Sequence, residues 1–415
     1  MRRVSSACLA AVAAALLLLP RSAAAQSQPD ASTLQQQIDQ LKKEFGERIA
    51  ALEAKLAEAQ AAPQAAAPAP APEPVAPAQP SAASGAKFFN PDTAVIGNFL
   101  GAAGHNEVSP SPAFEMRESE VSFQAVVDPY ARADFFLAFG EEGVELEEGF
   151  ATFTELPGDL QVKAGKMRAA FGKVNTLHTH VLPWADRPLV INNLLGGEEG
   201  ISDAGVSVAR LIPIGNLFFE ATGQVFRGDA AGGELYKSSK PGDVSYVAHL
   251  RGYHDLTESA NLDFGASYSR GHNAAGIVDD VDLGRFTTQL FGVDATFRWR
   301  PLTRAIYHQF VARTEYIRSH REQVDGLQKA DGFYVSGDYQ FARRWWMGGR
   351  LDQSGRADDA SLLDRGQSFL LTFKPSEFSQ FRGQYRRTAY GNGPAANEFL
   401  MQFQFAIGAH GAHPF

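Results

Sequence analysis

The chain has 415 residues, of which 44% are hydrophobic and 20% are charged, and its formal net charge is −9 at pH 7. This acidic balance argues against nucleic acid as a partner, because binding to phosphates requires a basic surface. After the first 25 residues, the sequence contains no apolar run of the length, about 18 residues, that a transmembrane helix needs. A membrane protein built of helices is thereby excluded. A β-barrel is not, because each barrel strand carries a much weaker apolar signal.

The first 25 residues have the pattern of a secretory signal peptide. Two arginines near the start precede a short apolar run over residues 9–19, and small residues lead to an expected cleavage site after Ala25. The one cysteine, Cys8, precedes this run and would be removed with it, so we expect a mature chain without disulfides or a lipidated cysteine. We therefore predict an exported protein with residues 1–25 as its signal peptide.

Residues 26–60 predict a periplasmic coiled-coil helix, and residues 61–86 predict a linker. After Ser32, a candidate N-cap, apolar residues recur at spacings of three and four, which is the pattern of a coiled-coil seam. The seam consists of Leu34, Ile38, Leu41, Phe45, Ile49, Leu52 and Leu56. So narrow a stripe favours self-association; the alternative is a helix lying on the protein's own surface. The linker is rich in Ala and Pro, which favours an extended spacer through which the helix could reach into peptidoglycan.

The third segment, residues 87–415, alternates apolar and polar side chains in short runs, which is the period of β-strands. In the last run, Phe399 and Met401 belong to one face and Leu400 and Gln402 to the other. Tight links alternate with longer polar connections, as expected for a barrel with turns on one rim and loops on the other. We predict an all-β transmembrane antiparallel β-barrel of about 16 strands, preceded by the α-helical coiled coil.

The predicted connections sort to two rims if both termini are periplasmic. The tight links, all periplasmic, are 128–130, 156–159, 213–216, 255–260, 301–305, 342–344 and 375–378. The longer, outer connections are 101–113, 173–200, 227–242, 271–284, 319–330, 354–365 and 391–396, with a short exception at 140–143.

Two further features favour a membrane barrel. Aromatic residues cluster near the predicted periplasmic rim, as interfacial girdles do; they are Trp299, Tyr307, Phe341, Trp345, Trp346 and Phe378. The chain ends in an apolar strand whose final residue, Phe415, resembles the signal read by the barrel-assembly machinery. These features predict the outer membrane of a Gram-negative bacterium as the location, with outer-membrane lipid and the assembly machinery as partners.

One short motif resembles a known family. The run GKMRAAFG, residues 165–172, resembles a strand-end pattern of phosphate-selective porins, with Met167 in place of an aromatic residue and Ala170 in place of a proline. The coiled coil ahead of the barrel is similar to the periplasmic extension of sugar-specific trimeric porins. Both resemblances imply a homotrimeric channel of sixteen strands, and neither identifies the solute.

The longest connection, residues 173–200, follows the fifth predicted strand. Its position resembles that of the loop that folds into the lumen of general porins, so we expect it to constrict the channel. The alternative is an extracellular loop packed on a neighbouring subunit or on lipid. Its candidate site residues are His178, His180, Asp186, Arg187, Glu198 and Glu199.

The alternation also assigns charged side chains to the wall of the lumen. Acidic residues belong mainly to the early strands and arginines to the later ones, an arrangement that would set an electric field across the lumen. Alternatively, these charges pair along the wall and mainly solvate it. The predicted pore-lining residues are Glu118, Glu120, Asp134, Lys166, Arg168, Glu220, Arg298, Arg313, Arg350, Arg382 and Arg386.

The function that this pattern predicts is a porin for passive diffusion of small hydrophilic or ionic solutes. We expect neither a cofactor nor enzymatic activity, because nothing like a nucleophile motif surrounds Ser269 and His272. Another candidate function is that of a barrel that tethers the outer membrane to peptidoglycan. A receptor with a plug domain would need a longer and more complex segment than residues 27–86.

A zinc-linked channel is a further alternative, based on two histidines of the longest connection. His178 and His180 could chelate zinc, with Asp186 as a third ligand. A zinc site in a protein normally has three or four ligands, so we expect no metal at this incomplete set.

Overall fold

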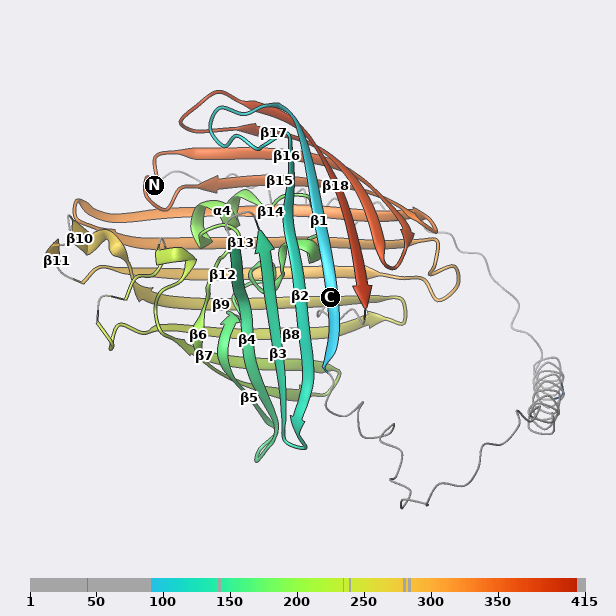
Figure 1. The fold of residues 1–415 in the computed structure, drawn as a ribbon, viewed down its shortest axis with the longest axis horizontal. Coiled ribbons are helices and arrows are strands. Elements are labelled where there is room, and N and C mark those ends of the chain that lie inside the picture. Colours follow the sequence, from blue (N-terminus) through green and yellow to red (C-terminus); the bar gives the residue numbers. More distant parts are fainter. Residues whose placement is uncertain are drawn as a thin grey trace, which may run out of the picture. The chain divides into compact units, whose positions relative to one another are not determined.

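The structure is a computed structural model that describes residues 91–408, except 141, 142, 234, 239, 279, 280, 283 and 284, together with Lys43. Within these residues, sixteen antiparallel strands close into one barrel, as predicted (Figure 1). The predicted signal peptide, linker and terminal Phe415 lie outside the described residues, as does the coiled coil apart from Lys43. No helix in the described part of the chain is both long and apolar enough to cross a membrane.

Each barrel strand pairs with its neighbours in the sequence, and the first strand pairs with the last to close the barrel. The strands are β1 (Asp92–His105), β2 (Phe114–Asp128), β3 (Ala131–Gly140), β4 (Gly143–Leu156), β5 (Leu160–Arg168), β6 (Ser202–Ile214), β7 (Leu217–Phe226), β8 (Ser245–Thr257), β9 (Ala260–His272), β12 (Thr287–Trp299), β13 (Gln309–Gln323), β14 (Gly326–Ala342), β15 (Trp345–Gly355), β16 (Leu363–Ser376), β17 (Ser379–Ala389) and β18 (Ala396–Gly408). The connection after β9 carries a small hairpin of β10 (Ile277–Val278) and β11 (Val281–Asp282).

Side-chain alternation gives the barrel an apolar outer face. In β18, Phe399 and Met401 are 50% and 54% exposed, whereas Leu400 and Gln402 are 2% and 1% exposed, as the sequence predicts. Exposing large apolar side chains to water costs about 25 cal/mol per Å² of surface, so an outer face of this kind requires an apolar environment.

The connections sort to two rims, but one predicted loop is wrong. Residues 319–330 do not form a loop: β13 and β14 continue through this stretch, with Gln323 opposite Gly326 across a two-residue link. The stretch is polar on both faces, which resembles a loop in sequence. Its backbone nevertheless pairs as a hairpin, from Ser319 opposite Ala330 to Gln323 opposite Gly326.

The predicted aromatic cluster lies at the rim of the short connections. Trp299 ends β12 and Trp345 begins β15, while Tyr307 and Phe378 lie in the links themselves. The Trp345 ring packs 4.6 Å from the ring of Phe373 on the adjacent strand.

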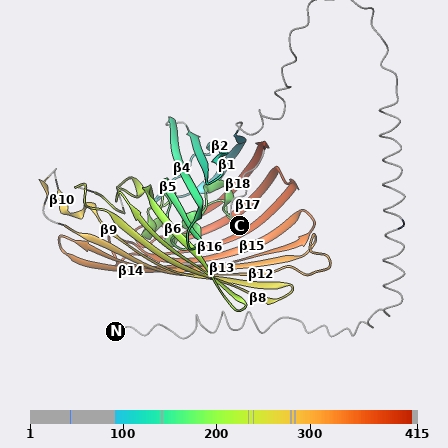
Figure 2. The same ribbon diagram turned by 90° about the horizontal axis from the view of Figure 1, so that it is seen from below.

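The connection between β5 and β6, residues 169–201, folds into the barrel interior, and we name it the lumen loop. It contains the 3-10 helices η1 (Val174–Thr176) and η2 (Thr179–Val181) and the short helix α4 (Leu189–Leu195). The helix packs on β13, β14, β15 and β16, which face β2–β4 across the barrel (Figures 1 and 2).

Four apolar side chains of α4 are almost fully buried, each at 0–1% exposed; they are Val190, Ile191, Leu194 and Leu195. They join inward-facing wall residues such as Ile317, Tyr334 and Leu370 in one core. Burying a side chain of this size stabilises the fold by about 1.5–3 kcal/mol. The lumen loop is thus an integral part of the barrel core.

Candidate functional site

The lumen loop is fastened where it leaves and re-enters the wall. Asn175 donates hydrogen bonds from Nδ2 to the carbonyls of Ala169 (2.9 Å) and Ile201 (3.1 Å), and the Ile201 amide donates to Asn175 Oδ1 (2.8 Å). One amide side chain therefore ties both ends of the loop together. The backbone amide of Gly172 donates to Ser267 Oγ on β9 at 2.8 Å.

The first loop residues reach the opposite wall. Lys173 Nζ lies 3.0 Å from Asp263 Oδ2 on β9, and the Val174 amide donates to Glu315 Oε2 on β13 at 3.3 Å. Burial lowers the pKa of Lys173, and the neighbouring Asp263 carboxylate opposes that change. These contacts carry the chain from β5 across the barrel interior.

Asp186 lies at the centre of the loop and is held by three side chains of the wall. Its carboxylate accepts hydrogen bonds from Arg350 (2.9 Å), Arg386 (3.1 Å) and Gln384 (2.5 Å). Gln384 also accepts a hydrogen bond from the Ala185 amide at 2.9 Å. Burial alone would raise the pKa of Asp186, but the two guanidinium groups outweigh burial and hold that pKa below its ordinary value. Asp186 is therefore ionised at neutral pH.

Aromatic and arginine contacts hold the loop on either side of Asp186. Arg382 donates to the carbonyl of Leu182 at 3.0 Å. The Trp184 ring, 1% exposed, lies edge-on to Tyr334 with ring centres 5.1 Å apart, and the Arg350 guanidinium lies 5.0 Å from its ring centre. Such stacked guanidinium contacts strengthen where water is excluded.

Arg187 is buried within the loop itself rather than presented to solvent. Its guanidinium donates to the carbonyls of Leu177 (3.0 Å) and Val174 (3.4 Å). Burial lowers the pKa of Arg187 to about 9, and the nearby Arg168 guanidinium adds to that effect. Arg187 therefore stabilises the loop conformation.

Glu198 and Glu199 lie where the loop returns to the rim. Glu198 pairs with Arg117 of β2, and burial, which raises the pKa of Glu198, is outweighed by this guanidinium so that the pKa falls. Arg168 donates to the carbonyls of Glu198 (2.9 Å) and Glu199 (3.2 Å). The return of the loop is thus held by arginines from two strands.

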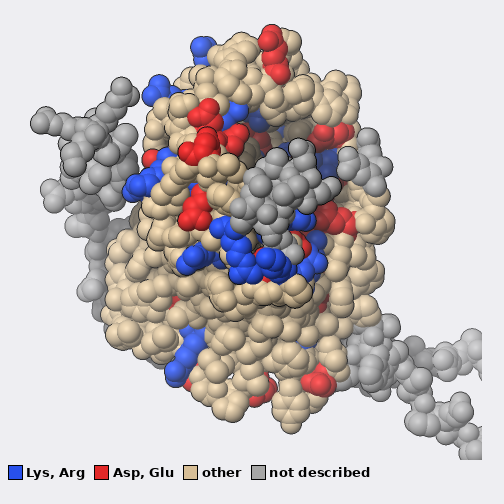
Figure 3. All heavy atoms as spheres, turned by 90° about the vertical axis from the view of Figure 1, so that its left-hand side faces the viewer, with Lys and Arg blue, Asp and Glu red and all other residues tan. Residues whose placement is uncertain are grey.

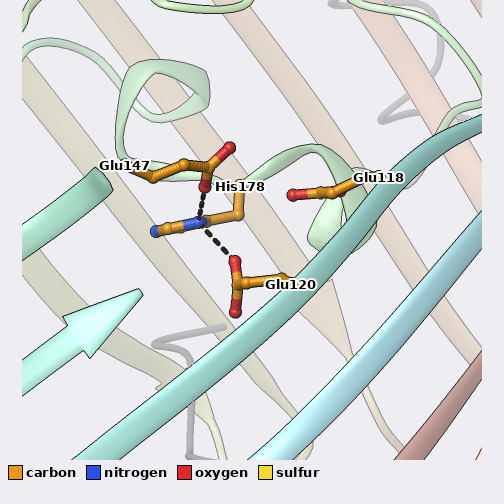
Figure 4. A group of neighbouring side chains, drawn as sticks. All are labelled: Glu118, Glu120, Glu147 and His178. Atoms are coloured by element: carbon orange, nitrogen blue, oxygen red, sulfur yellow. Dashed lines mark hydrogen bonds and ion pairs between the residues drawn. The ribbon is translucent and has the colours of Figure 1, made fainter. Parts of the chain in front are cut away.

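His178 inserts between carboxylates of two wall strands (Figure 4). Its Nδ1 lies 2.6 Å from Glu147 and 2.8 Å from Glu120, and its Nε2 lies 2.8 Å from Glu148. Burial by itself would lower the pKa of His178, but hydrogen bonds to these three carboxylates outweigh it and raise the pKa well above its ordinary value.

The structure does not bring together the three residues considered for zinc from the sequence. His180 Nδ1 lies 3.4 Å from Glu118, and the His178 and His180 rings are 5.7 Å apart. Asp186 instead pairs with the arginines described above. A different set lies together at His178: the ligand atoms of Glu118, Glu120 and Glu147, with the imidazole, all lie within 4.8 Å of one another.

Nine of the predicted pore-lining residues belong to the inward-facing sets of their strands. They are Glu118, Glu120, Asp134, Glu220, Arg298, Arg313, Arg350, Arg382 and Arg386. Several of these charges pair along the wall, as in the contact of Arg313 with Asp338 at 2.5 Å and of Arg298 with Asp263 at 3.7 Å.

Lys166 and Arg168, the other two predicted pore-lining residues, lie at the end of β5. Met167, between them, is 2% exposed and lies opposite Asp203, which is equally buried, so these two face inward. Strand alternation then turns Lys166 outward. The Arg168 side chain instead reaches the lumen loop: it is 6% exposed, contacts the carbonyls of Glu198 and Glu199, and lies 3.9 Å from Glu147. Lys166 donates to the carbonyl of Leu146 at 2.6 Å, at the rim.

A cavity of about 530 Å³ lies beside α4 on the side of the long connections. Its lining includes four arginines and four aspartates; they are Arg321, Arg350, Arg356, Arg386, Asp186, Asp352, Asp358 and Asp364. Figure 3, which looks onto the end that carries β10 and β11, shows Lys and Arg gathered near the middle of this face with Asp and Glu around them.

Sequence reasoning missed Glu147, Glu148 and Arg117. Two β-bulges explain this, one where β3 meets β4 and one where β1 meets β2, because each shifts the alternation by one residue. The acidic run over residues 145–148 was the available signal for the first of them.

Comparison with known proteins shows the fold. No family profile matches the chain. An uncharacterized protein of Aquifex aeolicus is 29% identical over 350 residues, covering 76% of this chain and 73% of its own length.

Three solved structures resemble the barrel. They are the anion-selective porin from Comamonas acidovorans (TM-score 0.54, 8% identity, 76% of this chain and 99% of that one), the trimer form of the outer-membrane protein OmpT of Vibrio cholerae (0.51, 11%, 76% and 99%) and the outer-membrane channel DcaP of Acinetobacter baumannii (0.50, 10%, 77% and 96%). At these identities the likeness establishes one thing, that this chain has the sixteen-strand barrel fold of outer-membrane porins.

Proposed function

We propose that the protein is an outer-membrane porin through which small hydrophilic or ionic solutes diffuse passively. The observation that carries the proposal is the lumen loop, which crosses the interior of the barrel and leaves a charged cavity beside α4. The apolar outer face and the aromatic rim support a location in a lipid bilayer. The likeness to known porins and channels supports the same function.

The lumen loop would act as the constriction of this channel. Its polar contacts reach β9, β13, β15 and β17, so it is held from several sides rather than hinged at its ends. A segment anchored in this way cannot swing out of the lumen without breaking buried ion pairs. We infer a constriction of constant width rather than a gate.

The charges around the cavity support weak ion selectivity. The four arginines and four aspartates of its lining balance formally, so the local field favours neither cations nor anions strongly. Opposite charges at close range instead favour dipolar solutes, which can present both signs. Phosphate selectivity, which the motif at residues 165–172 suggested, gains no support from Lys166 or Arg168, because Lys166 faces outward and Arg168 is engaged with the carbonyls of Glu198 and Glu199.

Assembly as a homotrimer is part of the proposal. The self-associating seam predicted at residues 32–60 supports it, and one structural relative is described as a trimer. In this arrangement the coiled coil would lie in the periplasm, where it could reach peptidoglycan.

Single-channel recording in planar bilayers tests the proposal. The purified protein should give stepwise, ohmic conductance with similar permeability for K⁺ and Cl⁻. Deleting residues 176–195 should raise the conductance of each step, because it removes α4 and the Asp186 contacts from the lumen.

A matched control deletes residues 110–112, which are exposed in the connection between β1 and β2 and do not line the cavity. This deletion should leave conductance unchanged. Absence of conductance in the intact protein would refute the channel, and equal conductance of the 176–195 deletion would refute the constriction.

A further inference from the structure

The cluster around His178 has the composition of a metal site. Glu118 and Glu120 come from β2, Glu147 from β4, and His178 from the lumen loop, so three separate segments converge on one point (Figure 4). Glu118, Glu120 and His178 are buried, at 5%, 1% and 2% exposed. Three carboxylates and one imidazole nitrogen are sufficient in number to hold a divalent cation.

Two carboxylate oxygens in this cluster have no hydrogen-bond donor. Glu118 Oε2 and Glu120 Oε1 are fully buried and accept no hydrogen bond within the described structure. Leaving a buried carboxylate oxygen unsatisfied is costly, more so than for a neutral group. A bound cation would satisfy both oxygens at once.

The surroundings of the imidazole favour a ligand at Nδ1. Glu148 lies 2.8 Å from Nε2 on the far side of the ring and can accept a hydrogen bond from the N–H group there. In a neutral imidazole this leaves the Nδ1 lone pair directed at Glu120 and Glu147. A carboxylate that orients a histidine in this way is the usual outer partner of a metal-binding imidazole.

The cluster also carries an excess of negative charge. Two guanidinium groups approach it. Arg168 lies 3.9 Å from Glu147 and is also engaged with the carbonyls of Glu198 and Glu199, and Arg187 lies near Glu118. When the imidazoles are neutral, as a metal ligand must be, the four carboxylates of Glu118, Glu120, Glu147 and Glu148 outnumber these two guanidinium groups. Buried like charges repel strongly unless a cation lies between them.

We propose that Glu118, Glu120, Glu147 and His178 bind one divalent cation of the Zn²⁺ class, with Glu148 as the positioning residue for the imidazole. The nitrogen ligand favours Zn²⁺ over Ca²⁺ and Mg²⁺, which take oxygen ligands. The ion would fasten the lumen loop to β2 and β4, the side of the barrel opposite α4. The proposal is independent of the porin function, because it concerns loop anchoring alone.

Metal content after equilibrium dialysis of the full-length protein against ZnCl₂ tests the site. The wild-type protein should retain a single zinc ion per chain and gain thermal stability, and EDTA should reverse both effects. Glu120→Gln and His178→Gln should lose this ion. Glu148→Gln should weaken zinc binding by about 10- to 100-fold, the usual effect of removing an outer partner.

A control variant separates the site from general effects of histidine loss. His249 lies on β8, bonded to Ser267 at 2.8 Å and away from the cluster, so His249→Gln should bind zinc as the wild type does. In addition, Glu120→Gln should abolish the shift in melting temperature that zinc causes in the wild type.

X-ray absorption at the zinc edge of the wild-type protein keeps the test independent of variant folding. It should show oxygen ligands with a single imidazole. Failure of the wild type to retain zinc would overturn the proposal, as would equal retention by Glu120→Gln and His178→Gln. A spectrum with two or more imidazoles would contradict the proposed ligand set and would overturn it too.

Discussion

Replacing Asp186 with asparagine should destabilise the protein more than any other single carboxylate-to-amide change in the lumen loop. The substitution preserves shape but removes the charge that pairs with Arg350 and Arg386. Both guanidinium groups are largely buried, with side chains 2% and 16% exposed. An amide can still accept one hydrogen bond, so the loss is electrostatic rather than steric.

The size of the effect follows from the partners that remain. Breaking a buried ion pair typically costs about 3–5 kcal/mol. Arg350 keeps Asp352 at 2.8 Å and Arg386 keeps Glu398 at 2.8 Å, so neither guanidinium is left alone. We therefore expect Asp186→Asn to lower the unfolding free energy by about 3 kcal/mol, the lower end of that range.

The dependence of this difference on pH provides a second check. Because the folded pKa of Asp186 is depressed, its contribution is complete above the unfolded value of about 3.9 and is lost as pH falls toward the folded pKa. The difference between wild type and Asp186→Asn should be constant from about pH 5 to 8 and shrink below about pH 4.

Urea unfolding in lipid vesicles, followed by tryptophan fluorescence, measures both quantities. Asp92→Asn is the matched control, because Asp92 is exposed at the start of β1. If Asp186→Asn lowers the unfolding free energy no more than the control does, the ion pairs of Asp186 with Arg350 and Arg386 do not hold the loop. A difference that grows as the pH falls would lead to the same conclusion.

Three further sets of variants test other parts of the structure. Trp184→Ala should lower the unfolding free energy by about 3–5 kcal/mol, as truncation of a buried aromatic residue does, and Trp184→Phe should lower it less. Equal, small losses for both variants in urea unfolding would contradict the packing of Trp184 against Tyr334. Gly172 and Gly215 both have positive φ, 59° and 60°, so each alanine variant should lose about 1–2 kcal/mol. Gly172→Ala should lose more in the same assay, because its Cβ would collide with Glu315 whereas that of Gly215 meets open space; equal losses would contradict this. Deleting residues 32–60 should weaken the oligomer on native gels in mild detergent, and an unchanged oligomer would show that the barrel walls suffice.

The strand number and the facing of most wall residues could be predicted because both depend on local pattern. A period of two and the turn residues between strands are readable without knowledge of the partners, as in the alternation of Phe399 and Leu400. Lys166 and Arg168 show the limit: the facing of Lys166 is evident only from Met167 opposite Asp203, and the contacts of Arg168 depend on where the lumen loop returns.

The anchoring of the lumen loop could not be predicted, because it depends on contacts between distant parts of the chain. The contacts of Asp186 with Arg350 and Arg386 join residues that are 164 and 200 positions apart in the sequence. The cluster around His178 further requires the bulge that turns Glu147 toward the imidazole. Hydrophobic periodicity does not contain either kind of information.

We propose that solutes pass through the barrel beside the lumen loop, and a single thiol tests this passage directly. The one native cysteine, Cys8, lies in the predicted signal peptide, so Asn192→Cys would introduce the one thiol of the mature protein, at an exposed position in the cavity lining. A charged methanethiosulfonate should lower single-channel current in Asn192→Cys, and dithiothreitol should restore it. Glu258→Cys, exposed on the link between β8 and β9, should show no change. An unaltered current after complete labelling of Asn192→Cys would contradict the account.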